Sequence, residues 1–226
     1  MTETRHSYDE QLNEIREGVV KLAARVCEQI GAATESLLAG DLVAVDRVYA
    51  DRHEILEGSH ELERRAYQLL ALQQPMAADL RTLLTVLRVL HEIELTSGLM
   101  RNVAKATRRL YPNELLPRIS GIIERMGSQA TVQMRLAIES FAGSDANVAA
   151  ALPDMDDVMD DLQKELFRAI FALGAPDESA LQRAVQITFV GRDYERAADH
   201  AVTIGRWVGF MVTGTMPGSE SADQTS

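Results

Sequence analysis

The sequence has very little cysteine, with Cys27 as the single example among 226 residues. One cysteine excludes an intramolecular disulfide and any cysteine-rich zinc site, and such usage is typical of a reducing compartment. Because Cys27 falls within an apolar stretch that has helical spacing, we expect it to be a small core residue and not a nucleophile.

Aromatic residues are also scarce, at 5% of the chain, and proline and glycine number only 6 and 14. Strands are usually rich in aromatic and β-branched residues, so this shortage argues against a sheet. Apolar residues nevertheless make up 46% of the chain, which is enough for a sizeable core. The composition therefore favours long helices that pack through aliphatic side chains.

Long apolar runs and an excess of positive charge are both absent. No run approaches the roughly 18 apolar residues that a bilayer-spanning helix needs, and residues 1–9 are polar, without the core of a signal peptide. The formal net charge of −11 argues against binding nucleic acid or an anionic membrane through a basic face. We therefore expect a soluble, acidic protein located in the cytoplasm.

Apolar residues recur at spacings of three and four in six stretches, which predicts six amphipathic helices. Asp41 follows Gly40 at the first break and is expected to be the N-cap of the second helix. Pro75 is expected to open the third helix, because proline is favoured at the first helical position. The later breaks contain glycine, proline or small polar residues, at 111–113, 143–145 and 174–177.

The two halves of the chain follow the same plan. Glu94 precedes Glu195 by 101 residues, and residues 102–105 are similar in kind to residues 203–206. Short connections make successive helices antiparallel, and three such helices close a bundle. We predict an all-α protein of two tandem antiparallel three-helix bundles related by duplication, at 8–112 and 114–213, followed by a disordered tail at 214–226.

Two pairs of acidic residues, each four residues apart, stand out in the second half. Asp156 and Asp160 share one helix face, and Glu195 and Asp199 share a face of the last helix. Neighbouring helices would bring the four carboxylates to one groove, where they must stay solvated or hold a cation. All-oxygen ligation suits Mg²⁺, Mn²⁺ or Ca²⁺, and iron as well. On spacing alone, however, a solvated charged face is the more common arrangement.

Other site chemistries find less support. A ferritin-like di-iron site expects Glu-x-x-His motifs on two helices, and the chain has none. His53 and His60, with Glu57 and Glu61 nearby, fit a polar helix face better than a ligand set. Phosphate-binding loops, nucleophile elbows and His-Glu-x-x-His motifs are absent, so nothing indicates an enzyme.

Three stretches resemble signatures of the PhoU family, and they fall in the order that the family shows. Residues 70–81 (LALQQPMAADLR) are similar to the signature between its second and third helices. Residues 156–167 (DDVMDDLQKELF) resemble the acidic opening of its fifth helix, and residues 192–201 (RDYERAADHA) a signature of its last helix. The resemblance covers residues 8–213, almost the whole chain.

The resemblance implies two tandem three-helix bundles and a regulatory role. PhoU proteins are negative regulators of phosphate uptake and of the phosphate-starvation response, as adaptors between the ATPase subunit of the phosphate ABC transporter and a sensor histidine kinase. Members bind magnesium, manganese, zinc or iron at Glu/Asp-x-x-x-Asp pairs, one cluster in each bundle. The matching metal ligands in this chain are Asp156, Asp160, Glu195 and Asp199.

The first half departs from this metal-binding pattern. Glu94 is in place, but its partner four residues on is Gly98. On the second helix the matching pair would be Arg52 and Leu56, neither of which can bind a hard cation. We therefore predict that the first bundle has lost its metal site, with Glu94 as a degenerate remnant, and that the second bundle has kept one.

The function that follows is that of a non-enzymatic adaptor with a homodimeric assembly. A metal-dependent phosphoesterase is one alternative, and it would need an open metal position and a general base in a cleft. A divergent paralogue that serves as a structural helical interaction module is the other.

Overall fold

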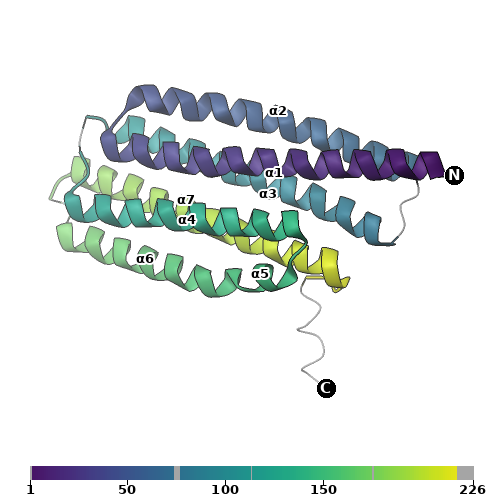
Figure 1. Ribbon diagram of the computed structural model, residues 1–226. Coiled ribbons are helices and arrows are strands. Elements are labelled where there is room, and N and C mark those ends of the chain that lie inside the picture. Colours follow the sequence, from purple (N-terminus) through teal and green to yellow (C-terminus); the bar gives the residue numbers. More distant parts are fainter. Residues whose placement is uncertain (1, 74–76, 113, 175, 218–226) are drawn as a thin grey trace, which may run out of the picture.

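A computed structural model describes the chain apart from residues 1, 74–76, 113, 175 and 218–226 (Figure 1). Every regular element within the described residues is a helix. The helices are α1 (Thr2–Ala39), α2 (Leu42–Gln73), α3 (Ala77–Leu110), α4 (Pro117–Gly143), α5 (Ala146–Ala150), α6 (Leu152–Leu173) and α7 (Glu178–Thr213). None of them combines the length and the apolar character that a membrane crossing requires.

The helices form two bundles that lie side by side along their lengths (Figure 1). Helices α1, α2 and α3 all contact one another and form the first repeat, while α4, α6 and α7 do the same in the second. Contacts of α1 with α4 and of α3 with α7 join the repeats. The predicted all-α fold of two repeats, each built on three long helices, is confirmed.

The fifth predicted helix is divided in two. The short α5 is capped by Asp145, whose side chain accepts hydrogen bonds from the backbone N–H groups of Asn147 and Val148. Pro153, near the start of α6, lacks an N–H group and its ring crowds the preceding turn, so α6 starts as a new helix. A one-turn helix therefore precedes the fifth long helix.

Capping residues lie where the breaks in the sequence pattern predict them. Asp41 caps α2, since its Oδ1 accepts hydrogen bonds from the backbone N–H groups of Val43 and Ala44, at 2.8 and 3.1 Å. Gly40 has a φ of +64°, a conformation that favours glycine. The predicted role of Pro75 lies outside the described residues. So does the part of the predicted tail from residue 218 onward, and α7 ends just before Gly214.

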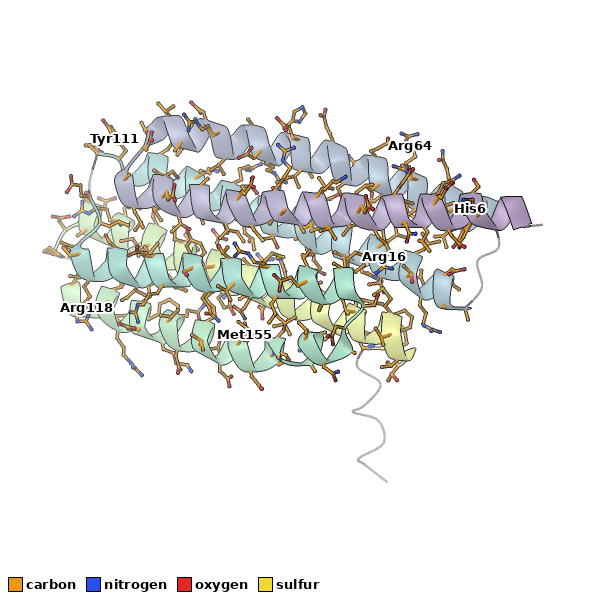
Figure 2. The ribbon with its side chains drawn as sticks, viewed as in Figure 1. His6, Arg16, Arg64, Tyr111, Arg118 and Met155 are labelled. Carbon is orange, nitrogen blue, oxygen red and sulfur yellow. The ribbon has the colours of Figure 1, made fainter. Side chains whose placement is uncertain are left out.

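Polar contacts supplement the apolar core where the repeats meet. Arg16 of α1, labelled in Figure 2, donates hydrogen bonds to the carbonyl oxygens of Phe141 and Ala142 at the end of α4, at 3.4 and 3.2 Å. Thr34 of α1 and the fully buried Tyr194 of α7 share a hydrogen bond of 2.7 Å. An arginine near a helix C-terminus satisfies carbonyls that have no partner within the helix.

Cys27 is half-buried against this core. Burial raises the pKa of its thiol to about 11, so the reactive thiolate is disfavoured. This agrees with the expectation that Cys27 is a packing residue.

Candidate metal centre

The four carboxylates of the second repeat come from the facing surfaces of α6 and α7. Met159 on α6 and Tyr194 on α7 are buried in the core, and the acidic residues each lie one position beyond such apolar residues. Met155, labelled in Figure 2, directly precedes Asp156 on α6. Asp156 and Glu195 are half-buried, whereas the other two acids of the set are exposed.

The structure brings these four carboxylates within electrostatic range of one another. Burial raises the pKa of Asp156, and the charges of Asp199 and Asp160 raise it further, while a hydrogen bond from Gln133 of 3.3 Å opposes the shift. Burial also raises the pKa of Glu195, and Asp199 adds to that increase. The four acids therefore act on one another electrostatically across α6 and α7, and their role as ligands of a cation stays a prediction.

Arginines partly compensate this negative charge. Burial and the charge of Asp160 raise the pKa of Asp199, while Arg206, Arg196 and Arg192 of the same helix act in the opposite direction. The arginines are exposed, and Arg192 and Arg206 lie seven residues before and after Asp199, so they share its face of α7. They therefore offset part of the negative charge of Asp199 from the same face of the helix.

The four carboxylates are the kind of ligand that a hard metal ion binds, although no three of them have oxygens within 4.8 Å of one another. Four carboxylates from two neighbouring helices match the oxygen ligands that Mg²⁺, Mn²⁺ and iron accept. Within the described residues, one set of three side chains has its ligand atoms within 4.8 Å of one another, and it lies in the first repeat instead. An ion between α6 and α7 would therefore require the exposed carboxylates, Asp160 and Asp199, to rotate inward.

In the first repeat, an arginine lies at the position that matches the metal-binding pair. The guanidinium of Arg52 on α2 donates a hydrogen bond to the carbonyl oxygen of Glu94 on α3, at 3.3 Å. The same group covers Gly98, where an added Cβ would come within 3.2 Å of the arginine Nη1. Burial and the charge of Arg101 lower the pKa of Arg52, and Glu94 opposes that shift. A side-chain cation thus lies at one of the expected ligand positions, Arg52, and covers a second, Gly98.

The convergent set in the first repeat consists of His60, Glu63 and Glu94, and the sequence did not reveal it. The sequence pattern groups His60 with Glu57 and Glu61 on a polar helix face and does not single out Glu63. His60 and Glu63 are three residues apart on α2 and so share a face. The three-residue spacing of His60 and Glu63 can be recognised in the sequence. The position of Glu94 beside them depends on how α2 and α3 pack, which the sequence does not give.

Comparison with known proteins places this architecture in a family. The PhoU domain matches the chain twice, at residues 19–107 and 123–208. The phosphate-specific transport system accessory protein PhoU homolog 2 of Mycobacterium tuberculosis is 35% identical over 214 residues, which cover 94% of this chain and 100% of that protein. Homolog 1 of the same species is 33% identical and covers 93% of this chain and 95% of its own length.

Solved structures show the same fold. PhoU from Pseudomonas aeruginosa superimposes with a TM-score of 0.86 at 24% identity, covering 92% of this chain and 100% of that one. The phosphate transport system regulatory protein PhoU from Streptococcus pneumoniae gives a TM-score of 0.84 at 23% identity, with 92% and 98% coverage. The phosphoesterase alternative has no support in these relatives, which are described as accessory or regulatory proteins. The chain belongs to the PhoU family, whose members are accessory and regulatory proteins and not enzymes.

Proposed function

We propose that this protein is a negative regulator of phosphate uptake and of the phosphate-starvation response. The observation that carries the proposal is the match of both repeats to the PhoU domain, together with relatives named phosphate-specific transport system accessory proteins that align with 94% of the chain. The protein acts in the cytoplasm as an adaptor between the ATPase subunit of a phosphate ABC transporter and a sensor histidine kinase.

The helical surfaces suit such an adaptor role. Large apolar side chains are exposed on consecutive turns of α7, at Leu181, Val185 and Phe189, and Phe171 at the end of α6 is 84% exposed. Exposed apolar clusters of this kind favour protein–protein contacts, including the homodimer that we propose. Signalling through the adaptor requires that it bind the two states of the transporter with different affinities.

We further propose that the second repeat holds a metal ion through Asp156, Asp160, Glu195 and Asp199. The ion is of the magnesium, manganese, zinc or iron type, and it supplies positive charge that offsets the repulsion among the carboxylates. The residues on α6 and α7 hold the ion between the two helices, so its role is to cross-link them and not to catalyse a reaction.

Deleting the gene in its own host tests the regulatory proposal. We expect phosphate-regulated genes, such as that for secreted alkaline phosphatase, to be expressed constitutively in phosphate-rich medium, and a plasmid copy of the gene to restore repression. Mycobacterium tuberculosis has two proteins named PhoU homologs, so any second copy in the host should be deleted as well. Normal repression in the strain that lacks both copies would contradict the proposal and favour a structural interaction module.

A further inference from the structure

Helices α3 and α7 run antiparallel where the two repeats meet. Three hydrogen bonds, of 3.0, 3.0 and 3.2 Å, set their register by joining Arg109 to Gln186, Thr96 to His200 and Thr85 to the carbonyl oxygen of Trp207. Because α1 packs on α3, α4 packs on α7 and α1 contacts α4, the inner side of this pair is covered and its outer side is open. We propose that this outer side, the α3–α7 seam, docks an acidic amphipathic helix of a partner protein.

Two stripes of residues at seven-residue spacing border the seam. On α3 the stripe consists of four exposed residues, Arg88, Leu95, Asn102 and Arg109. On α7 it consists of the exposed Gln182, Phe189 and Arg196 and the half-buried Thr203. Residues seven apart share one face of a helix, so each stripe runs along its helix beside the other.

The seam has a hollow at each end. One, of about 500 Å³, is lined by Arg109 and Leu110 at the end of α3 and by Val185 on α7. The other, of about 470 Å³, is lined by Arg88 on α3 and Trp207 on α7. Both hollows are in the size range of ligand pockets, so each can hold apolar side chains of a docked segment.

Apolar surface connects the two hollows. Leu95 and Phe189 belong to the stripes, and their side chains are 39% and 55% exposed. A partner that covers these side chains removes apolar area from water, which favours association. The seam therefore offers apolar contacts along its length as well as at its ends.

The charge of the seam selects an acidic partner. The chain has 34 acidic and 23 basic residues, yet the two stripes contain three arginines and no acid. Arg109 bonds to the neutral Gln186, and Arg88 lies 5.0 Å from the ring centre of Trp207. Within the described residues, none of the three stripe arginines forms an ion pair with a carboxylate. The guanidinium groups therefore remain able to bind carboxylates of a partner.

The length of the seam selects a helix. Arg88 and Arg109 are 21 residues apart, which corresponds to about 30 Å along α3. A small anion could contact only one of them, whereas an amphipathic helix of about 20 residues spans the same distance. Such a helix in a groove inserts apolar side chains at spacings of three and four. The inference deepens the adaptor proposal and rests on it for the identity of the partner.

Titration of the full-length protein with a synthetic peptide tests the seam directly. The peptide is an amphipathic helix of about 20 residues, without tryptophan, with leucine on one face and glutamate on the other; a second peptide has lysine in place of glutamate. Trp207 is the single tryptophan and lines one hollow, so its fluorescence reports occupancy. We expect the glutamate peptide to change this fluorescence in a saturable way and the lysine peptide not to bind.

Substitutions in the stripes should weaken binding of the glutamate peptide. Arg109→Gln with Arg196→Gln should lower the affinity by about fivefold or more, as expected for the loss of two exposed charge contacts. Phe189→Ser should lower it by about tenfold, because an apolar contact is lost. Both side chains of the arginine pair are exposed, and circular dichroism verifies that the variants fold.

Matched controls lie outside the seam. Arg118→Gln with Arg168→Gln removes the same charge from exposed positions on α4 and α6, and Phe171→Ser removes a phenylalanine that is 84% exposed on α6. These variants should bind the glutamate peptide as the wild type does. Equal effects of the seam and control pairs, equal binding of the two peptides, or no binding would overturn the proposal. Self-association that is lost in the seam pair, measured by sedimentation, would make a second copy the occupant and overturn it as well.

Complementation of the gene deletion separates this inference from the regulatory proposal. We expect the control pair to restore repression in phosphate-rich medium and the seam pair, Arg109→Gln with Arg196→Gln, to fail. If the seam pair restored repression fully, the docking seam would be wrong while the regulatory proposal stood. If the deletion itself had no effect, the regulatory proposal would fail, and the peptide titration would still decide whether the seam binds an acidic helix.

Discussion

Glu94 and Glu195 occupy matching places in the two repeats, yet their neighbours differ in charge. The pKa of Glu195 is raised by burial and by the carboxylates around it, with Asp199 the strongest of them. Beside Glu94, a guanidinium binds the helix backbone and a histidine faces the carboxylate. The duplicated positions have therefore diverged in electrostatics while the fold around them stayed the same.

At the scale of residues, the paired change Asp160→Asn and Asp199→Asn should remove metal from the second repeat. With a metal ion at 100 times its dissociation constant, the wild-type protein should gain about 2.7 kcal/mol of unfolding free energy, and the variant should not. In a chelator the variant should be at least as stable as the wild type, because two repelling charges are gone. Thermal unfolding with and without metal, together with elemental analysis, measures both effects.

A matched control for this pair lies one position further along α6. Asp157→Asn with Asp161→Asn makes the same change in net charge on the exposed side of the helix. Metal content should be unaffected in this control. If both pairs of substitutions left metal content unchanged, the assignment of the four ligands would be wrong.

At the scale of elements, α7 is the helix on which the second repeat is built, since it contacts α3, α4, α5 and α6. Its glycines allow two of these helices to approach closely. A Cβ added at Gly191 would lie 2.4 Å from a methyl group of Leu166. A Cβ at Gly205 would lie 2.6 Å from Leu152 and 3.0 Å from the carbonyl oxygen of Ala149. The junction of α5 and α6 thus packs directly against the backbone of α7.

The substitution Gly205→Ala should destabilise the protein by about 1–3 kcal/mol, because backbone at the α5–α6 junction would have to move. Gly209 on the same helix has open space where a Cβ would be added. Gly209→Ala should therefore leave stability unchanged or raise it by up to about 1 kcal/mol through helix propensity. Urea unfolding measures the two variants, and equal effects would show that α7 does not pack this closely on the junction.

At the scale of the whole molecule, a buried polar cluster lies between α3 and α7, where the two repeats meet. The Thr96 hydroxyl donates to the carbonyl oxygen of Glu92 and lies 3.0 Å from Nδ1 of His200. Because that hydroxyl has given its hydrogen to Glu92, it accepts a hydrogen bond from Nδ1–H of His200. Burial, with smaller contributions from the charges of Arg196 and His91, lowers the pKa of His200 to about 4. The repeats therefore pack around a neutral histidine.

Acid should weaken this interface. A histidine whose folded pKa is lower than its unfolded value stabilises the protein fully above about pH 6.5, and that contribution is lost as the pH falls toward 4. The loss amounts to at most about 3 kcal/mol. His200→Asn retains a donor to Thr96 but does not titrate, so it should abolish this part of the pH dependence.

Comparing the two proteins gives the contribution of the histidine together with that of its neighbour Glu92, whose Oε2 lies 4.0 Å from Nε2 of His200. Burial raises the pKa of Asp193 to about 6, and such a carboxyl group stabilises the folded state as the pH falls, which is the opposite effect. This opposing contribution is common to the wild type and the His200→Asn variant. Urea unfolding at several values between pH 4 and 7 gives the difference in free energy of unfolding, and a difference independent of pH would refute the prediction.

The sequence determined the helices, their breaks and the faces on which acidic residues lie. Apolar spacing and capping residues such as Asp41 and Asp177 act within a few residues of the chain, so they can be read locally. The same reasoning placed Asp156 and Asp160 on one face of α6. The break before Pro153 was also readable, but the continuous apolar spacing around it concealed the short α5.

Only the tertiary structure decided which faces meet and at what height along the helices. Spacing assigns a side chain to a face, but sliding one helix past its neighbour by one turn changes every partner without altering that spacing. This is why the group of His60 with Glu94, which belong to different helices, did not emerge from the sequence. The cover of Gly98 by Arg52 and the burial of His200 between the repeats likewise depend on packing that links distant parts of the chain.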